Sequence, residues 1–375
     1  MNETQIQSAV PAPAGRAPLK PREAVRRMAP YSPPSAGREG RLRLDFNENT
    51  VGCSPLVLRA IRRYLTRDRV ATYPEYESSR ARLAAAFGRA GDETIITNGT
   101  DEAIQLAVST FVEPGERVIV SEPTFAMYRF YASVAGADVV DVRPGEDLVF
   151  PVEAVRAEAA RHGARAIFIA NPNNPTGTAI APEAVESLAA EFPATLVFVD
   201  EAYFEFYGKT GLPLIDRYPN LLVSRTFSKA YGLAALRIGC LFAAGETAAH
   251  MRKAQSPYSV NSVALAAALE AVSDRAYVEK YVGQVLRSRA TLAREFRRLG
   301  IPCVPSEANF LLARFGERAR AVRDGLRDRG VLARDRSYEL PGCVRFTVGA
   351  TAQTRRLVRE LREVLKDAGE ASSKP

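Results

Sequence analysis

Lys229 and Asp200 are the two residues whose type and surroundings most clearly suggest chemistry. Lys229 is one of only seven lysines, and its neighbours in TFSKAYGLA, residues 226–234, are small or apolar rather than charged. An amine among apolar groups has a lowered pKa and becomes a nucleophile, although such a side chain can also extend to the surface. Asp200 ends the apolar run TLVFVD. A buried carboxylate there needs a positive partner, unless it only caps a helix.

A Gly-Thr-Asp turn in ITNGTDEAIQLA, residues 96–107, indicates a place where a phosphate could bind. The turn precedes a predicted helix, so the N–H groups of Thr100 and Asp101 would point outward at the positive end of the helix dipole. The same residues also fit an ordinary capped helix with nothing bound, in which Thr100 or Asp101 is the N-cap. The turn alone does not decide between the two interpretations.

Two more polar segments follow predicted strands. The loop IANPNNPTG, residues 169–177, would expose the amides of Asn173 and Asn174 at the sheet edge, although Asn-Pro turns are also common in ordinary loops. Tyr203 lies three residues after Asp200, where its phenol could meet the same ligand or could pack in the core. Because ligands collect at the carboxyl ends of strands in open α/β sheets, these positions are candidates for one site.

Together these segments describe one ligand, pyridoxal phosphate. A lysine amine can form an imine with its aldehyde, its phosphate needs N–H and guanidinium donors, and its pyridine nitrogen needs an acid partner to stay protonated. Lys229 and Asp200 supply the amine and the acid. Thr226, Ser228 and Arg237, which flank Lys229 in the sequence, add two hydroxyls and a guanidinium to the predicted helix start.

The elements that must position these residues alternate between helices and short β-branched runs from about 75 to 245. Such buried, near-continuous apolar strands predict a mostly parallel sheet covered on both faces. After residue 260, long helices and short strands predict a smaller α+β unit. The predicted strands are 117–121, 166–170, 195–200, 221–226, 238–244, 301–305, 309–314 and 343–348, and the predicted helices are 80–88, 101–112, 124–135, 151–162, 181–191, 260–272, 275–299, 316–329 and 352–367.

The bulk composition is that of a globular protein. The 375 residues are 46% hydrophobic and 25% charged, and no apolar run approaches the ~18 residues of a membrane span. The N-terminus lacks the apolar region of a secretory signal, so we expect a cytoplasmic location. The net charge is +8, but basic and acidic residues are interspersed, so no nucleic-acid partner is indicated.

The cysteines and histidines do not indicate a metal site. The four cysteines form no C-x-x-C pair, and the two histidines, His162 and His250, are isolated in the sequence. We therefore expect no metal and no disulfide framework, and a catalytic histidine has little support.

The order and spacing of nine motifs resemble those of the fold-type I aminotransferases of class I and II and, among these, the histidinol-phosphate aminotransferase group. The resemblance implies a large domain at 71–269 with a mostly parallel seven-stranded sheet. It also implies a small α+β domain at 41–70 and 270–375. Residues 1–40 are rich in Pro, Ala, Gly and Arg, a composition that predicts a partly disordered N-terminal arm. The motifs are LDFNENTVGCSP (44–55), TYPEY (72–76), GTDEAI (99–104), PTFAMYRFY (123–131), NPNNPTG (171–177), VDEAYFEF (199–206), TFSKAYGLAALRIG (226–239), ANFLLAR (308–314) and RDRSYELPGCVRFTVG (334–349).

By position, the resemblance implies roles around the cofactor ring. Lys229 would hold pyridoxal phosphate as a Schiff base and then move a proton between the substrate carbon and the cofactor. Asp200 would pair with the pyridinium nitrogen. Tyr203 and Asn174 would donate hydrogen bonds to the ring oxygen, and Phe125 would stack on the ring face.

The resemblance also implies how the anionic groups are held. Arg345 would bind the carboxylate of the amino donor in a bidentate manner. Arg334 and Tyr31 stand where the group's enzymes bind the phosphate of histidinol phosphate. Tyr73 would reach the cofactor phosphate from the other subunit of a homodimer, and the remaining phosphate ligands would be Thr100, Asp101, Ser228 and Arg237.

Two departures from the group's pattern leave the substrate open. Thr50 replaces the usual proline after Asn-Glu-Asn, and Phe125 stands where tyrosine is common. The first hypothesis is amino transfer between histidinol phosphate and 2-oxoglutarate, with glutamate as the donor in the reverse direction. The alternatives are an aminotransferase for aromatic or other amino acids, a phosphoamino-acid decarboxylase, and a regulator without catalytic activity.

Overall fold

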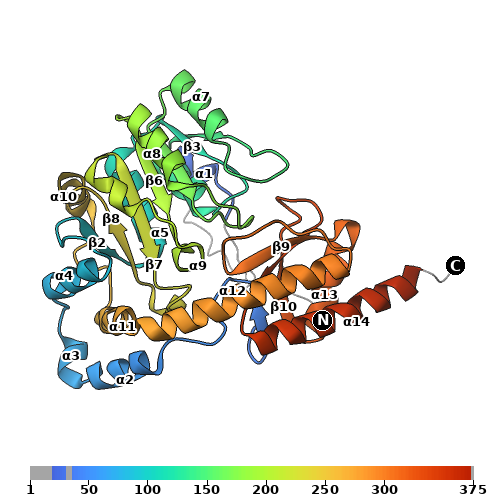
Figure 1. The fold of residues 1–375 in the computed structure, drawn as a ribbon. Coiled ribbons are helices and arrows are strands. Elements are labelled where there is room, and N and C mark those ends of the chain that lie inside the picture. Colours follow the sequence, from blue (N-terminus) through green and yellow to red (C-terminus); the bar gives the residue numbers. More distant parts are fainter. Residues whose placement is uncertain (1–18, 31–35, 373–375) are drawn as a thin grey trace, which may run out of the picture.

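The computed structural model describes residues 19–30 and 36–372, which form a seven-stranded and a four-stranded sheet with their surrounding helices (Figure 1). In the larger sheet only β8 runs antiparallel to its neighbours. This confirms the predicted fold class, a mostly parallel sheet with a smaller α+β unit. In spatial order the strands are β2 (Thr94–Thr97), β8 (Gly239–Phe242), β7 (Leu221–Thr226), β6 (Leu196–Asp200), β5 (Ala166–Ala170), β3 (Arg117–Val120) and β4 (Asp138–Asp141).

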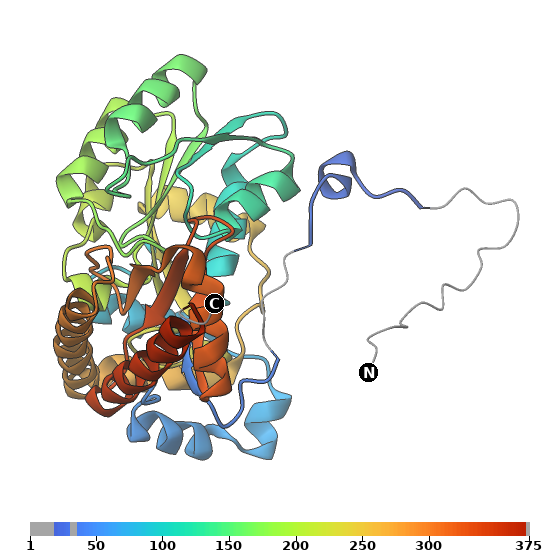
Figure 2. The ribbon, with the colours of Figure 1, turned by 90° about the vertical axis from the view of Figure 1, so that its right-hand side faces the viewer.

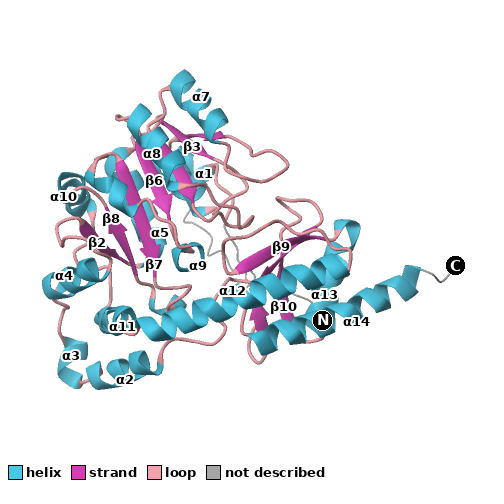
Figure 3. Ribbon diagram, in the orientation of Figure 1, coloured by secondary structure: helices cyan, strands magenta, loops and turns pink. Residues whose placement is uncertain are grey.

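The central strands of the larger sheet are buried on both faces because their sequences are apolar throughout. All residues of β6 and β7 are buried. Alternate side chains of β6 enter different cores: Phe198 packs in one cluster, while Val197 and Val199 pack in the other. Helices cover both faces, as Figure 3 shows. They include α4 (Tyr76–Ala86), α5 (Gly99–Phe111), α6 (Met127–Ala135), α7 (Val152–His162), α8 (Pro182–Glu191), α9 (Phe204–Tyr207), α10 (Gly245–Ala254) and α11 (Ser262–Ser273).

The smaller sheet begins with a strand from near the N-terminus, β1 (Leu42–Leu44), which pairs in parallel with β10 (Val331–Asp335). β10 and β9 (Phe310–Arg314) each pair antiparallel with β11 (Cys343–Thr347). Seen from the right-hand side of Figure 1, helix α14 lies in front, on the outer surface of this unit (Figure 2). The helices of this unit are α12 (Arg275–Arg298), α13 (Ala319–Asp328) and α14 (Thr351–Ser372).

The two units share segments from both ends of the chain. Helix α2 (Pro55–Tyr64) contributes Val57 to the core beside the larger sheet, although the preceding strand β1 pairs in the smaller one. Conversely, Tyr203 and Ala230 follow strands of the larger sheet in sequence, but they pack in the core of the smaller unit. The domain boundary at residue 70 stays a prediction. That boundary assigns α2 to the small domain, whereas Val57 of α2 packs in the core beside the larger sheet.

Several details differ from the sequence-based expectations. The predicted strand 301–305 is not formed, and only Cys303 makes an isolated bridge, to Ala313. Pro302 and Pro305 lack the N–H groups that a ladder needs. Strands β2, β4 and β10 were not predicted, nor were helices α1 (Glu23–Arg26), α2, α3 (Arg67–Ala71), α9 and α10. Within the described ranges, no helix is both long and apolar enough to cross a membrane.

Candidate active site

A cavity of about 240 Å³ lies at the carboxyl ends of β5, β6 and β7, where parallel strands leave side chains free to meet a ligand. The structure brings together on its walls ten of the eleven residues predicted to contact the cofactor. They come from five separate segments of the chain. These residues are Thr100, Asp101, Phe125, Asn174, Asp200, Tyr203, Thr226, Ser228, Lys229 and Arg237.

Lys229 lies on the cavity wall just after β7. Its Nζ donates a hydrogen bond to the backbone oxygen of Phe46 at 3.1 Å and lies 5.9 Å from the ring centre of Tyr203. Burial, together with the nearby Arg345, lowers the pKa of Lys229 to about 8. The amine is therefore uncharged in a useful fraction near neutral pH, as a nucleophile or proton acceptor must be.

Asp200 is buried at the end of β6, where three donors fix its carboxylate. Tyr128 donates to Oδ2 at 2.9 Å, Ser224 donates to Oδ1 at 3.0 Å, and the backbone N–H of Ala202 donates to Oδ1 at 3.2 Å. Burial nevertheless raises the pKa of Asp200 to about 6. No basic side chain among the described residues forms an ion pair with Asp200, so the site suits a cationic ligand group such as a protonated ring nitrogen.

Tyr128 is a residue that the sequence analysis quoted but did not assign. It is fully buried, its ring stacks on Phe168 at 5.3 Å, and Phe125 meets its edge at 5.7 Å. Phe125 lies two residues before α6 and Tyr128 in its first turn, and the backbone N–H of Tyr128 donates to the Phe125 oxygen at 3.3 Å, so a turn brings the two side chains together. That spacing was a usable signal for Tyr128. The partner Ser224 had none, because it lies inside the apolar run of β7.

The start of α5 forms a cradle for an anion. The side chain of the N-cap residue Asn98 makes no capping hydrogen bond. It therefore leaves the first N–H groups of the helix available to a ligand. The hydroxyl of Thr100 is buried and has no hydrogen-bond partner in the described part of the chain. An added Cβ at Gly99 would lie 2.5 Å from Nη2 of Arg237. A phosphate fits this cradle because it supplies acceptors for the orphan donors.

The remaining phosphate candidates surround the same point. Ser228 accepts a hydrogen bond from the Thr226 hydroxyl at 3.0 Å, so the two hydroxyls are placed together. Arg237 donates to Asp101 at 3.3 Å and has a φ of 53°. A non-glycine residue in this left-handed region is strained, and such strain is concentrated at ligand sites.

Arg345 is a buried guanidinium on β11 that has no acidic partner in the described ranges. Nη1 donates to the side-chain oxygen of Asn174, and Nη2 donates to the backbone oxygen of Asp45 at 2.7 Å. Nε has no partner in the described structure. Burial and the nearby Arg336 lower the pKa of Arg345 to about 10. Arg345 does not itself line the cavity, but Asn174 does, so a carboxylate beside Asn174 would satisfy this charge.

Tyr203 is oriented by a residue of the smaller unit that the sequence analysis did not assign. Its hydroxyl accepts a hydrogen bond from Nδ2 of Asn47 at 3.0 Å. Asn47 has a φ of 57°, and its backbone is held by Thr347 at 2.9 Å and Asn309 at 3.1 Å. The segment 44–55 was recognised as a motif, but its role in fixing the phenol depends on contacts about 156 and 300 residues away in sequence.

Two further cavity residues come from the same motif. Phe46 and Glu48 line the wall beside Lys229. Arg38 donates to the Glu48 carboxylate at 2.7 and 3.2 Å. Although burial raises the pKa of Glu48, its bonds to Arg38 outweigh that effect and hold the pKa below its usual value. An ionised carboxylate therefore faces the cavity, and no sequence signal distinguished it from a surface acid.

The other predicted substrate and cofactor residues lie outside this cavity. Arg334 lies 5.6 Å from the ring of Phe46 and lines an adjacent groove of about 260 Å³ with Tyr338. Tyr73 is 73% exposed and stacks on Tyr258 with 4.4 Å between ring centres. Tyr31 lies outside the described residues. No cluster of His, Cys, Asp and Glu among the described residues has the arrangement of a metal site.

Comparisons with known proteins agree with this geometry. The family described as aminotransferase class I and II matches residues 40–361. The histidinol-phosphate aminotransferase of Symbiobacterium thermophilum is 41% identical over 358 residues, which cover 92% of this chain and 98% of that protein. That of Caldanaerobacter subterraneus subsp. tengcongensis is 37% identical, with 87% and 93% covered.

Solved structures give the same result. The crystal structure of histidinol-phosphate aminotransferase from Sinorhizobium meliloti, in complex with pyridoxal-5′-phosphate, superimposes with a TM-score of 0.86 at 28% identity. The match covers 94% of this chain and 99% of that one. A histidinol-phosphate aminotransferase structure from Clostridium acetobutylicum has a TM-score of 0.78 at 25% identity, with 87% and 99% covered.

Proposed function

This chain belongs to the aminotransferase class I and II family, and we propose that it transfers the amino group of histidinol phosphate to 2-oxoglutarate. Its cofactor is pyridoxal 5′-phosphate. The main support is one cavity that holds the amine of Lys229, the carboxylate of Asp200 and the anion cradle at the start of α5. These three groups are complementary to the aldehyde, the ring nitrogen and the phosphate of that cofactor.

In the proposed site, each group has a separate task. When bound, the cofactor would supply the acceptor for the amino group and the electron sink for the adjoining carbon. Asp200 keeps the ring nitrogen protonated, and Tyr203 and Asn174 orient the ring by hydrogen bonds. Phe125 covers one ring face. Lys229 Nζ takes the proton from the substrate carbon that carries the amino group and delivers it to the cofactor.

Anionic groups are held at the two ends of the site. Thr100, Asp101, Ser228 and Arg237 hold the cofactor phosphate, with Thr226 supporting Ser228. At the other end Arg345 binds the carboxylate of glutamate or 2-oxoglutarate, because its buried guanidinium has a free donor and no acid beside it.

The substrate phosphate is assigned to Arg334, with Tyr31 as a second ligand. Arg334 contacts Phe46, whose ring is part of the cavity wall, so a substrate extending past Phe46 would reach its guanidinium. An arginine matches the geometry of a phosphate and is suited to this task.

A homodimer is part of the proposal. Tyr73 and Tyr258 form an exposed aromatic pair, and Leu65 and Val70, which precede Tyr73 in sequence, are 51% and 67% exposed. A second copy covering this surface would bury these side chains and bring Tyr73 to the neighbouring phosphate cradle. Sedimentation of the purified protein tests the assembly, and a fully active monomer would contradict it. The cytoplasmic location stays a prediction.

The substrate assignment is tested by comparing the two half-reactions. Arg334→Ala is expected to lower kcat/KM for histidinol phosphate by about 10- to 100-fold, since charged hydrogen bonds contribute about 1.5–3 kcal/mol. The glutamate half-reaction should change less than about threefold, because glutamate has no phosphate. Arg318→Ala, an exposed arginine of the same unit, serves as the control. Equal losses on both substrates, or a wild-type preference for an aromatic amino acid, would reject the assignment.

A further inference from the structure

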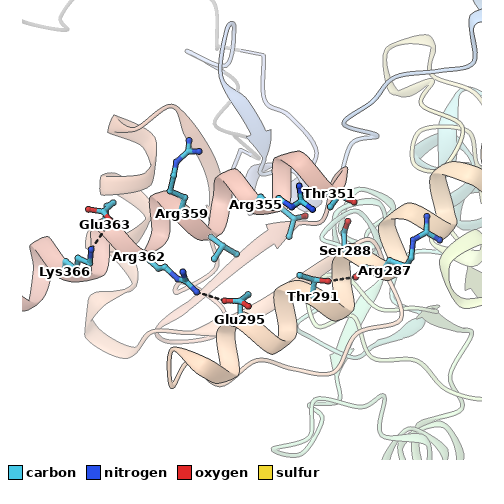
Figure 4. A pocket seen from close by; sticks show the side chains of 12 residues that line it. Arg287, Ser288, Thr291, Glu295, Thr351, Arg355, Arg359, Arg362, Glu363 and Lys366 are labelled. Atoms are coloured by element: carbon cyan, nitrogen blue, oxygen red, sulfur yellow. Dashed lines mark hydrogen bonds and ion pairs between the residues drawn. The ribbon is translucent and has the colours of Figure 1, made fainter.

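A further hollow, of about 750 Å³, lies between α12 and α14 on the outer side of the smaller unit (Figure 4). We call it the α12/α14 groove. It is distinct from the active-site cavity, with which it shares no lining residue. Five basic side chains line it but only two acidic ones do, and of the basic ones Arg359 pairs with Glu360 outside the lining, so the groove carries an excess of positive charge. The basic residues are Arg287, Arg355, Arg359, Arg362 and Lys366, and the acidic ones are Glu295 and Glu363.

The acidic residues compensate only one end of the groove. There Arg362 pairs with Glu295 at 2.7 Å, and Lys366 pairs with Glu363 at 3.1 Å. At the other end Arg287 and Arg355 have no ion-pair partner among the residues that the structure describes. Both side chains are exposed on the wall of the groove, and no acid among the described residues neutralises either of them, so an anion bound at this end would meet two positive charges.

Hydroxyl groups line the uncompensated end. Figure 4 shows Ser288 and Thr291 on α12 facing Thr351 and Arg355 on α14. Ser288 is only 2% exposed, and its Oγ has no hydrogen-bond partner in the described structure. An unpaired buried hydroxyl costs stability, and it is normally retained only where water or a ligand completes it.

The first turn of α14 lies at the same end. The helix has 22 residues and begins at Thr351, which lines the groove. The backbone N–H of Ala350 is satisfied by Oε1 of Gln353 at 2.8 Å, and that of Thr354 by the Ala350 oxygen at 3.0 Å. The N–H groups of the first helical residues lie between these two, at the positive end of the helix dipole.

From the convergence of these features we propose that the uncompensated end of the α12/α14 groove binds an oxyanion of the phosphate class, at a site separate from the catalytic one. Arg287 and Arg355 supply the charge, and Ser288 and the start of α14 supply directed hydrogen-bond donors. A phosphorylated small molecule is the class of ligand that matches a site with two guanidinium groups and a hydroxyl, because phosphate oxygens accept several hydrogen bonds at once.

Calorimetric titration of the holoenzyme with inorganic pyrophosphate at low ionic strength tests this site. The double variant Arg287→Ala/Arg355→Ala is expected to weaken binding at least about tenfold, and Ser288→Ala by several-fold. Arg297→Ala removes an exposed arginine of α12 outside the groove and should leave the affinity unchanged. Repeating the titration in an Arg334→Ala background removes anion binding at that residue and so separates this site from the one near the active site.

Two results would overturn the proposal. One is a double variant that binds pyrophosphate as tightly as the wild type. The other is an equal loss in the Arg297→Ala variant, which would mean that pyrophosphate associates with the positive surface in general. The groove variants and their control can be tested in folded protein because Arg287, Arg355 and Arg297 are exposed, and Ser288→Ala removes a single oxygen.

Discussion

Two adjacent acids at the end of β6, Asp200 and Glu201, have opposite surroundings. Glu201 accepts a hydrogen bond from Nε of Arg225 at 2.7 Å, and both side chains are almost fully buried. The backbone of Gly211 and the hydroxyl of Thr210 complete the bonds of that pair. Asp200 has neutral donors but no cation, although the cavity beside it is lined by Lys229.

The difference teaches how to separate structural from functional charges in this protein. The Glu201–Arg225 pair is complete within the chain, and its guanidinium also lies 3.4 Å from the ring of Phe204. Asp200 and Arg345 are buried and Lys229 is partly buried, and none of the three forms an ion pair with another described residue, although Glu48 lines the same cavity as Lys229. Burying a charge is costly unless it is paired, so incomplete groups around one cavity indicate that a ligand supplies the missing partners.

The largest expected effect is a loss of activity when Lys229, one of these unpaired groups, is replaced. Lys229→Ala should lower the rate of both half-reactions at least about a thousandfold, because general acid–base and nucleophilic functions are both lost. The visible absorbance of the lysine-bound cofactor should disappear, while the melting temperature of the apoenzyme stays nearly constant. Lys253→Ala, an exposed lysine on α10, is the control. A Lys229→Ala enzyme with normal turnover would contradict the distinction between unpaired functional charges and paired structural charges.

Substitution in the Glu201–Arg225 pair should instead lower stability and leave cofactor binding intact. Glu201→Gln leaves Arg225 buried and uncompensated, so the free energy of unfolding should fall by about 3–5 kcal/mol. Urea denaturation of the apoenzyme measures this change. The fraction that remains folded should still bind the cofactor and show its lysine-bound absorbance. A stable Glu201→Gln protein that cannot bind the cofactor would mean that this pair belongs to the site.

Asp200→Asn sharpens the comparison through pH. The folded pKa of Asp200, about 6, lies above the usual 3.8, so the folded apoenzyme binds more protons between these values. The contribution of Asp200 to stability is therefore present below about pH 4 and is lost as pH rises to about 6. The apoenzyme of Asp200→Asn lacks this loss, so it should gain stability relative to the wild type across that window. A constant difference between pH 4 and 7 would contradict the raised pKa.

The same Asp200→Asn substitution should reduce catalysis strongly once the cofactor is present. Its amide cannot neutralise a protonated ring nitrogen, so we expect kcat to fall by about a hundredfold or more. Stopped-flow measurement of the glutamate half-reaction gives this rate. Unchanged turnover would show that the acid is not needed at the ring nitrogen.

The smallest expected effect concerns the anion cradle. Gly99→Ala and Gly88→Ala both place a side chain at a positive φ, of 77° and 69°, and should each cost about 1 kcal/mol. Only the new Cβ at Gly99 would meet another group, Arg237 Nη2 at 2.5 Å, whereas nothing lies within 4 Å at Gly88. Gly99→Ala alone should therefore weaken cofactor affinity, by several-fold. Equal affinities in a fluorescence titration would remove Arg237 from the cradle.

The sequence was most informative where local composition determines structure. The apolar runs at 166–170 and 221–226 match β5 and β7 residue for residue, because strands buried on both faces need no alternation. The short strand β4, DVVD, is only partly buried and lacks such a run. The strand expected at 301–305 failed because proline content outweighed its apolar residues.

The site was predictable where a motif marks one residue, and less so where partners meet across the chain. Lys229 and Asp200 stood out by their neighbours in sequence. Tyr128, Asn47 and Glu48 act through bonds to residues 72, 156 and 10 positions away. A single sequence contains no record of those distances in space, so the supports of the site required the structure.

The packing of Ala230 gives the lysine a mechanical connection that its chemistry alone would not suggest. Ala230, the residue after Lys229, is buried in the core of the smaller unit, and its backbone oxygen accepts a hydrogen bond from Asn49 at 2.9 Å. The backbone next to the reactive lysine is thus held where the larger and smaller units meet. The position of the lysine backbone therefore depends on the packing of the smaller unit as well as on the larger sheet.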